Sequence, residues 1–526
     1  MRIIRLLPVV LVTALAACVI NPKVASVQAP LRPNIILILA DDMDAEYGAW
    51  IDYFPRFRSL LASEGTTFGN ALVNVSICGP SRASILRGQY AHNSQIFTNE
   101  PPGGGFQRFY DLGLEKSTLA TWLHDSGYKT VLLGKYINGY GTPGTPGWDY
   151  DKTGKRVGIE YYFGEPGIPG RKHVPPGWDE WYSGDQRTYN QFNYDLIENG
   201  EAVNYGNAPQ DYLQDVIRRK ATDFIRRVSS ANPRQPFFMS MDVIAPHQPE
   251  TFAPRHADAF PGVTAPRPPS FNEKETEASQ HPRWLRRWPQ LTETQIKALD
   301  EIYRNRLRSL LAVEETVEEV IQTLRDTGQL ENTYIVFTSD NGFHLGQHRL
   351  PRNKNTGFKE DYHVPLIVRG PGVPAGRFLQ NLVANVDLAP TFAELAGIRT
   401  PEFVDGRSLV PLLRESAAED KDWRHAFLLE HGFPQGEKRG LPPRTPFEPT
   451  FYGLHTDRNL VYIEYPTTGE KVLYDLEKDP YQQTNIAGLA DATLISKLSA
   501  WLSRLRSCIG NECRAIENEL PVSANH

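Results

Sequence analysis

Residues 34–42 read NIILILADD, an apolar run followed by two acidic residues that decides the fold class. A second run of the same kind, TYIVFTSDNG at residues 333–342, also ends in polar side chains. Short apolar runs rich in β-branched residues are typical of buried parallel strands covered on both faces by helices. In open α/β sheets, ligands gather at the carboxyl ends of the strands. The polar side chains at the two ends are therefore expected to meet at one site. They are Asp41, Asp42, Asp340 and Asn341.

Helical and extended segments alternate between these two runs, as an α/β fold requires. Helices are expected at residues 117–127, 213–228 and 292–330, and strands at residues 129–133 and 236–243. The last of these helices has the clearest helical spacing of apolar residues, so it should pack on the sheet. Four of its glutamates should be solvated. They are Glu314, Glu315, Glu318 and Glu319.

The other segments indicate loops and a smaller C-terminal part. Residues 139–180 and 248–290 are rich in Gly, Pro, Trp and Tyr with little periodicity, so they should form long loops over the face that carries the site. Further on, short strands are expected at residues 426–430, 459–465 and 471–476, before a helix at residues 494–506. This order predicts a C-terminal α/β subdomain with an antiparallel sheet over residues 415–515.

Length and charge limit the classes of function. A chain of 526 residues can bury a large core and suggests one large domain plus a smaller one. Its formal net charge is -6, and no long basic block is present. Nucleic acid is therefore not an expected partner.

The first 18 residues read as an export signal. Two arginines precede an apolar run that is too short for a comfortable membrane span. The small residues before Cys18 resemble the bacterial lipoprotein processing box, which predicts a lipid-anchored protein in the periplasm or at the cell surface. The alternative is an ordinary signal cleaved near Ala25 or Ala29, with Cys18 discarded. Export is expected in both cases.

Export affects the expected pairing of the cysteines, because an oxidising compartment favours disulfides. Cys18 belongs to the signal, and Cys508 and Cys513 are close enough in sequence to close a small loop. Cys78 is left over. Its ordinary interpretation is a buried, unreactive thiol.

Two further features favour a charged site. The four strand-end side chains offer only oxygen ligands, which suit a hard cation such as calcium, although strand-end aspartates also often cap helices. The segment that begins at Cys78 looks like a helix start, since Pro80 is tolerated in a first turn. Its free backbone N–H groups and the fork of Arg82 could hold an anion next to the cysteine.

The stretch CGPSR at residues 78–82, followed by LRG at residues 86–88, resembles the signature of type I sulfatases, whose cysteine is oxidised after synthesis to formylglycine. Arg87 stands where the family usually has Thr, but the core Cys-x-Pro-x-Arg is complete. The resemblance implies an alkaline-phosphatase-like α/β fold, with a large central mixed sheet flanked by helices and a catalytic domain over residues 32–414. Other stretches resemble family landmarks in the same order. They are residues 38–43, 134–136, 245–247, 339–342 and 350–354.

Details resemble the N-acetylglucosamine-6-sulfatases and the extracellular endosulfatases. These are the stretches at residues 135–138, 175–181 and 341–347. Many other sulfatases have a histidine two residues after the lysine, where this chain has Ile137 followed by Asn138. That departure leaves open which group takes a proton from the aldehyde hydrate. Lys359, where related sequences often carry Glu, leaves the local pocket charge open.

The resemblance implies a mechanism with calcium and formylglycine at position 78. The hydrated aldehyde would lie on the ion, attack sulfur with one hydroxyl, and expel sulfate with the other. The implied metal ligands are Asp41, Asp42, the modified Cys78, Asp340 and Asn341. A formylglycine-generating enzyme is an implied partner during maturation.

The remaining site residues follow from the same resemblance. Lys135, Lys354 and Arg82 would stabilise charge on the sulfuryl oxygens. His247 would protonate or hydrogen-bond the departing oxygen, and Asn138 and His344 are expected to bind substrate. The implied substrate is a sulfated sugar, with glucosamine 6-sulfate as a candidate, or an aryl sulfate.

Three alternatives stay open. Phosphate or phosphonate ester hydrolases of the same architecture can use similar nucleophiles and metals. A catalytically silent glycan-binding lipoprotein is expected if the host never oxidises Cys78. The stretch HPRWLRRW at residues 281–288 could hold an anionic sugar, but a packed loop with solvated arginines is the better interpretation.

Overall fold

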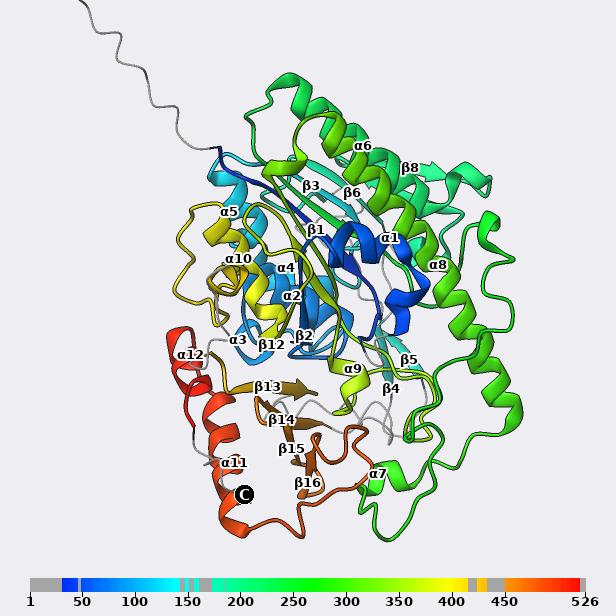
Figure 1. The fold of residues 1–526 in the computed structure, drawn as a ribbon, viewed down its shortest axis with the longest axis vertical. Helices are drawn as coiled ribbons and strands as arrows, with labels where there is room; N and C mark the ends of the chain where they lie inside the picture. The colour runs from blue at the N-terminus through cyan, green and yellow to red at the C-terminus, as the bar shows by residue number, and fades with distance from the viewer. Residues whose placement is uncertain are drawn as a thin grey trace, which may run out of the picture. The chain divides into compact units, whose positions relative to one another are not determined.

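The computed structural model describes residues 31–45, 49–141, 147–150, 156–159, 173–184, 186–414, 423–432 and 450–520. Its centre is a ten-stranded mixed sheet (Figure 1). In spatial order the strands are β12 (Arg377–Ala384), β2 (Thr66–Leu72), β11 (Leu366–Arg369), β10 (Thr333–Ser339), β1 (Asn34–Ala40), β9 (Phe237–Asp242), β3 (Lys129–Gly134), β6 (Glu180–Gly184), β7 (Tyr194–Glu198) and β8 (Glu201–Tyr205).

Strand β1 lies in the middle of the sheet, parallel to both of its neighbours. Ala40 at its end pairs with Ser339 of β10, and Leu39 pairs with Asp242 of β9. Strand β3 continues the parallel set on the other side of β9, where Gly134 pairs with the same Asp242. The polar residues after these strands therefore meet at one edge of the sheet, as the sequence predicts.

Helices cover both faces of the sheet, and β1 shows why its sequence is apolar throughout. Ile36 and Ile38 pack on the face that carries α1 (Pro55–Phe57), α6 (Leu213–Ala231) and α8 (Glu293–Asp326). Leu37 and Leu39 pack on the face that carries α2 (Cys78–Arg87), α5 (Leu119–Asp125) and α10 (Leu388–Leu395). Figure 1 shows α6 and α8 side by side, across the sheet from α2, α5 and α10. The predicted fold class is confirmed.

The predicted helices are present, but their ends differ: α5 and α8 are shorter than predicted, and α6 continues to Ala231. Helix α5 begins after Thr118, whose N–H is accepted by the Thr121 hydroxyl in a capping box. Helix α8 ends at Asp326, and Gly328 follows in the left-handed conformation. One expectation is wrong: Glu314 is buried, and its carboxylate accepts the backbone N–H of Arg56 at 2.7 Å. It satisfies an otherwise unpaired donor at the start of α1.

The C-terminal part has the predicted antiparallel sheet. Its order is β13 (Ala426–His431), β14 (Phe451–Thr456), β15 (Leu460–Tyr465) and β16 (Glu470–Asp475), followed by α11 (Ala492–Leu505) and α12 (Asn511–Glu517). Strand β14 was not predicted, because Gly453 interrupts its pattern. A Cβ there would lie 2.9 Å from the carbonyl oxygen of Tyr462 on β15, so the glycine permits close strand pairing. The Cys508–Cys513 disulfide is confirmed.

Two loop expectations have different outcomes. Residues 139–180 contain the strand pair β4 (Gly147–Tyr150) and β5 (Arg156–Ile159), which was not predicted. The other loop has mostly turns, and its backbone bonds to the segment before Lys354, from Asn272 to Gly346 and from His348 to Ser270. Within it, His281 and Trp284 are buried and Arg283, Arg286 and Arg287 are exposed, which confirms the packed-loop interpretation.

The remaining elements are short. The helices are α3 (Ala91–Ser94), α4 (Gly105–Asp111), α7 (Arg283–Arg286) and α9 (Lys359–Tyr362). Single turns are η1 (Ala49–Tyr53), η2 (Arg58–Ala62), η3 (Leu114–Lys116), η4 (Gln186–Asn190), η5 (Pro209–Asp211), η6 (Pro254–His256), η7 (Leu330–Asn332), η8 (Asn385–Asp387) and η9 (Val410–Leu413).

Two sequence expectations fall outside the described residues. They are the export signal with Cys18 and the subdomain boundary at residue 415. In the part of the chain that the structure describes, no helix is both long and apolar enough to cross a membrane.

Candidate active site

The four predicted strand-end side chains lie together and are buried. The backbone N–H of Asp42 donates to the Asp340 carboxylate at 3.2 Å. The Asn341 amide donates from Nδ2 to Asp42 Oδ1 at 2.7 Å. The acidic pair after β1 and the Asp-Asn pair after β10 thus form one cluster. It comprises Asp41, Asp42, Asp340 and Asn341.

Cys78 lies beside this cluster, at the first residue of α2. The helix starts there because Ile77 is extended and Pro80 fits the first turn, and it ends at Gly88 in the left-handed conformation. The Cys78 Sγ atom lies 3.3 Å from Asp41 Oδ1 and 3.9 Å from Asp42 Oδ1. Burial and the charge of Asp41 raise the pKa of the thiol to about 12. An unmodified Cys78 therefore stays protonated at neutral pH and is a poor nucleophile.

Two buried lysines flank Cys78. Lys135 follows β3, and its Nζ atom lies 2.6 Å from Asp41 Oδ2. Lys354 lies on the loop after β10, where its Nζ atom contacts the Asp42 carboxylate and lies 2.8 Å from the Cys78 Sγ. Burial opposes both charges, but the neighbouring aspartates outweigh it and raise the pKa of each lysine above its ordinary value. Both side chains therefore carry a positive charge.

Arg82 lies one turn into α2 and binds two carboxylates. Its Nε donates to Asp340 at 2.8 Å, and its Nη1 donates to Asp242 at 3.1 Å. Its Nη2 has no hydrogen-bond partner among the described residues, although it is buried. Sequence analysis missed Asp242. A signal was present, because a third apolar strand, β9, ends in this acidic residue. Burial, partly opposed by Arg82, raises the pKa of Asp242 to about 6.

His247 also reaches the cluster, with Nε2 3.6 Å from the Asp42 carboxylate. Its Nδ1 lies 2.5 Å from the carbonyl oxygen of Gln248. A carbonyl can only accept a hydrogen bond, so Nδ1 carries a hydrogen. Burial lowers the pKa of His247, against the opposite effect of Asp41 and Asp42.

Tyr189 on η4 is a second residue that sequence analysis missed. Its ring lies 4.6 Å from the His247 ring and 5.1 Å from Lys135 Nζ, measured to ring centroids. Asn138 donates from Nδ2 to the Tyr189 hydroxyl at 3.4 Å, so this predicted pocket residue reaches the site through Tyr189. Ile137 is buried in the core.

His344 lies on the loop that carries Lys354. It forms an antiparallel β-bridge with Asn353, the residue before Lys354. Its Nδ1 lies 2.8 Å from Asp361. The partner of the buried His344 side chain is therefore Asp361, which is not part of the cluster. Contact of His344 with substrate stays a prediction.

The cluster can be tested for its fit to a cation. Its ligands are carboxylate and amide oxygens, the donors that calcium prefers. The Asn341 Oδ1 atom is buried and has no hydrogen-bond partner among the described residues, so it offers a free lone pair. Four groups, Asp41, Asp42, Cys78 and His247, place one ligand atom each within 4.8 Å of one another. The residues present therefore fit a hard divalent cation.

The charges and the burial of the site shift the pKa of its carboxylates in opposite directions. Burial would raise the pKa of Asp41, but Lys135, His247, Arg82 and Lys354 outweigh it and hold that pKa far below its ordinary value. Burial and the nearby Asp41 raise the pKa of Asp340 to about 6. Fixed positive charges thus surround Cys78, next to a group of carboxylates.

Comparisons with known proteins agree with this geometry. The family model described as Sulfatase matches residues 33–398, and the one described as N-sulphoglucosamine sulphohydrolase, C-terminal, matches residues 346–507. The chain is 36% identical over 511 residues to N-acetylglucosamine-6-sulfatase of Homo sapiens, covering 92% of this chain and 86% of the relative. It is 36% identical over 403 residues to the extracellular sulfatase SULF-1 homolog of Drosophila melanogaster, covering 76% of this chain and 33% of that protein.

A solved structure has the same fold. It is a protein in complex with its substrate D-glucosamine-2-N,6-O-disulfate, similar to this chain with a TM-score of 0.70 at 23% identity, over 93% of this chain and 99% of the other. The family match spans most of the chain and includes every strand end that contributes to the cluster. This chain belongs to the sulfatase family and is a sulfatase enzyme.

Proposed function

We propose that this sulfatase removes O-sulfate from a sulfated sugar, with glucosamine 6-sulfate as the first candidate and aryl sulfates as artificial substrates. The observation that carries this proposal is the position of Cys78, with Lys354 Nζ at 2.8 Å and the Asp41 carboxylate at 3.3 Å. A sulfate ester brought to this position would meet fixed positive charges in a buried site. The 36% identity to an N-acetylglucosamine-6-sulfatase supports the choice of sugar.

Cys78 is proposed as the precursor of formylglycine, whose hydrate supplies the nucleophilic oxygen. The thiol itself is unsuited to attack, since its pKa is raised to about 12. The first turn of α2 does not offer the free donors that the sequence suggested, because Pro80 has no N–H and the N–H groups of Gly79 and Ser81 bond to Asn99 and Ile77. A formylglycine-generating enzyme is the proposed maturation partner.

A calcium ion is proposed to be held by the strand-end oxygens together with position 78. When bound, it would supply a fixed charge that lowers the pKa of a hydroxyl and polarises the sulfate group. The proposed ligands are Asp41, Asp42, position 78, Asp340 and Asn341.

The cationic side chains are proposed to bind the sulfuryl oxygens. Lys135 and Lys354 are charged and have little freedom to move, because each is bonded to a buried aspartate. Arg82 is oriented by Asp340 and Asp242, and its Nη2, which lies 3.9 Å from the Asp41 carboxylate, has no hydrogen-bond partner among the described residues. Such preorganised charge stabilises a transition state without a reorganisation cost.

His247 is proposed to serve the leaving oxygen of the sugar. Because Nδ1 carries a hydrogen toward Gln248, a neutral His247 has only a lone pair on Nε2. The side chain can donate a proton from Nε2 only as the imidazolium. The nearby Asp42 carboxylate, 3.6 Å away, favours that charged form, but burial outweighs it and lowers the pKa of His247.

Two assays test the proposal on the full chain produced with the maturation enzyme. Peptide mass spectrometry of the segment with Cys78 should show the aldehyde, and an unmodified thiol in active native material would reject the precursor role. An inactive protein with an unmodified thiol would favour the glycan-binding alternative. Release of sulfate from glucosamine 6-sulfate and from nitrophenyl sulfate should exceed release of phosphate from nitrophenyl phosphate. A clear preference for phosphate would favour the phosphate or phosphonate ester hydrolase alternative.

Metal removal tests the cation. Chelation should reduce activity reversibly, and calcium should restore it better than zinc, because the ligands are oxygens. If chelation leaves activity unchanged and the purified protein holds no metal, the ligand assignment is wrong.

Export is also proposed, in line with the extracellular relative in Drosophila melanogaster. The two relatives above are animal proteins, so the bacterial lipoprotein interpretation depends on residues 1–18 alone. Mass spectrometry of the mature N-terminus tests it: a lipid on Cys18 would support the anchor, and cleavage near Ala25 or Ala29 would reject it.

A further inference from the structure

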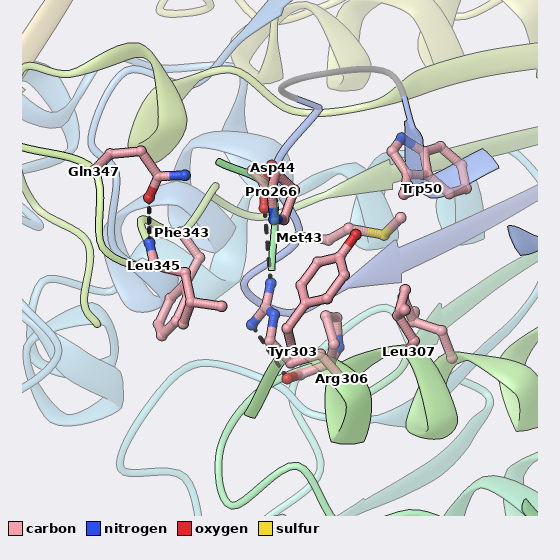
Figure 2. Close-up of a pocket in the computed structure, with 12 residues that line it drawn as sticks. Met43, Asp44, Trp50, Pro266, Tyr303, Arg306, Leu307, Phe343, Leu345 and Gln347 are labelled. Atoms are coloured by element: carbon pink, nitrogen blue, oxygen red, sulfur yellow. Dashed lines mark hydrogen bonds and ion pairs between the residues drawn. The ribbon is translucent and has the colours of Figure 1, made fainter. Parts of the chain in front are cut away.

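Arg306 on α8 is a buried arginine that reaches two backbone carbonyls at the edge of the site. Its Nη2 donates to the carbonyl oxygen of Asp42 at 2.6 Å, and its Nη1 donates to that of Pro246 at 3.3 Å. Its guanidinium lies 4.5 Å from the centre of the Phe343 ring. Figure 2 shows the side chain rising from α8 toward Asp44, with Phe343 beside it. Nothing in the sequence pattern of α8 distinguishes Arg306 from the neighbouring arginines of the helix.

The backbone that Arg306 holds has an unusual conformation. Asp42 has a φ of 66°, in the left-handed region that few residues other than glycine adopt. Its N–H is bonded to Asp340, and its carbonyl faces Arg306. A buried carbonyl without a donor is unfavourable, so the arginine stabilises the one conformation that places the carboxylate of Asp42 in the cluster.

The second carbonyl belongs to the residue before His247. One planar guanidinium therefore joins the segment after β1 to the segment after β9. These two segments carry the Asp42 carboxylate and the His247 imidazole, whose nearest atoms are 3.6 Å apart.

We propose that Arg306 is a positioning residue of the active site: it fixes Asp42 and His247 relative to each other by bonding the backbone of both segments. Its part in catalysis rests on the proposed function, whereas its effect on the backbone does not. It touches neither of the two functional side chains, so it acts through them.

Helix α8 offers a matched control. Arg308 donates from Nε to the carbonyl oxygen of Ala259 at 3.0 Å. It thus also bonds a loop carbonyl, but one outside the two segments that carry Asp42 and His247. Arg308→Met removes the same chemistry from the same helix without touching the site.

The experiment compares Arg306→Met, Arg306→Lys and Arg308→Met in the full, matured chain. Hydrogen exchange by mass spectrometry should be faster in Arg306→Met in the peptides that carry residues 40–45 and 243–248, and unchanged in the C-terminal sheet. Calorimetric titration should show calcium binding weakened about tenfold or more. With nitrophenyl sulfate, kcat should fall about 100-fold with a smaller change in KM, since misplaced groups affect the transition state most.

Arg306→Lys should recover part of each loss, because one ammonium can reach one carbonyl. Arg308→Met should match the wild type in all three measurements. An Arg306→Met protein with wild-type exchange, calcium affinity and kcat would overturn the inference. If Arg306→Met does not fold, Arg306→Lys decides: wild-type values in that variant would overturn the inference, and partial losses would support it. A wild type that shows neither sulfate release nor calcium binding would reject the proposed function, while faster exchange in the two peptides would still support the backbone role.

Discussion

The Lys354 Nζ atom lies 2.8 Å from the Cys78 Sγ, although 276 residues separate them in the chain. The same ammonium contacts the Asp42 carboxylate. Lys354 is delivered by the loop after β10, which the 248–290 loop holds from the outside through backbone bonds such as Asn272 to Gly346. The candidate active site is therefore completed by a loop, whereas its acidic half is built on strands.

Loss of this ammonium should impair catalysis more than folding. Lys354→Met is expected to lower kcat for nitrophenyl sulfate about 100- to 1,000-fold, because one preorganised charge next to the reacting group is removed. Lys297→Met is a control, since Lys297 is exposed on α8. Steady-state kinetics and thermal unfolding of both variants would check this. An Lys354→Met enzyme within a few-fold of wild-type kcat would contradict the assigned role.

Replacement of the proposed precursor should remove activity altogether. Cys78→Ala cannot be converted to an aldehyde, so turnover should fall by more than about 1,000-fold. The unfolding temperature should change little, because the side chain is small and lies among charged groups rather than in the apolar core. Activity above one tenth of the wild type would show that position 78 is not the nucleophile.

The acidic half of the site could be predicted because its signals are local. An apolar strand followed by Asp41 and Asp42, and a second followed by Asp340 and Asn341, require only that both strands be parallel neighbours, which the register of β1 and β10 confirms. The central sheet and the main helices were predictable for the same reason. The spacing of apolar residues along the chain indicates which side chains are buried. Burial of these side chains between the sheet and the helices stabilises an α/β fold.

The residues that sequence analysis missed lack such signals. Tyr189 lies on a single turn in an aperiodic region, and Arg306 is one of several arginines on α8 with no pattern that marks it as fully buried. Asp242 ended a strand but had no second acidic residue beside it. The burial of Glu314 was also missed, because its partners are backbone groups of α1, and no sequence pattern records such contacts.

The ring of Tyr189 should matter for substrate binding. Tyr189→Ala removes the aromatic wall next to His247 and Lys135, and KM should rise about tenfold with a smaller change in kcat. Tyr189→Phe keeps the ring and should remain within a few-fold of the wild type. Tyr182→Ala is the control, since that ring lies 4.4 Å from Lys220, outside the site. Equal KM values for Tyr189→Ala and the wild type would contradict this.

The pairing of His92 with Glu430 should make stability depend on pH. Burial alone would lower the pKa of His92, but the charge and hydrogen bond of Glu430 outweigh it and raise the pKa from 6.5 to about 9. The folded protein therefore holds a proton that the unfolded chain releases above about pH 6.5. The contribution of the pair, at most about 3 kcal/mol, is fully present below pH 6.5 and is lost as the pH rises toward 9.

Urea unfolding of the wild type and of His92→Gln would measure this contribution. The free energy of unfolding of the wild type should exceed that of the variant at about pH 6, and the difference should shrink by about pH 9. The comparison cancels the other titrating groups, which both proteins share. A difference that is constant across this range would show that the pKa of His92 is the same in the folded and unfolded states.

A buried ionic cluster should make a large contribution to the attachment of the C-terminal helices. Glu517 on α12 accepts from Arg424 Nε at 2.8 Å and from Arg407 Nη2 at 2.6 Å. Arg424 also binds both carboxylate oxygens of Asp387, at 2.6 and 2.7 Å, before α10. The side chains of Arg424, Asp387 and Glu517 are fully buried, so neither charge of a broken pair could be solvated.

Glu517→Gln keeps the shape of the side chain but removes its charge, which leaves two arginines with the single carboxylate of Asp387. The expected loss is about 3 kcal/mol in the free energy of unfolding, because an unpaired buried charge is costly. Glu519→Gln is the matched control two residues on, where the ion pair with Arg504 is half exposed and should contribute less than about 1 kcal/mol. Urea unfolding followed by tryptophan fluorescence would measure both, with Trp501 on α11 packed beside α12 as one reporter. Equal losses of unfolding free energy in the two variants would contradict a special contribution of the buried cluster. The apolar contacts of α11 and α12 would then attach the C-terminal helices.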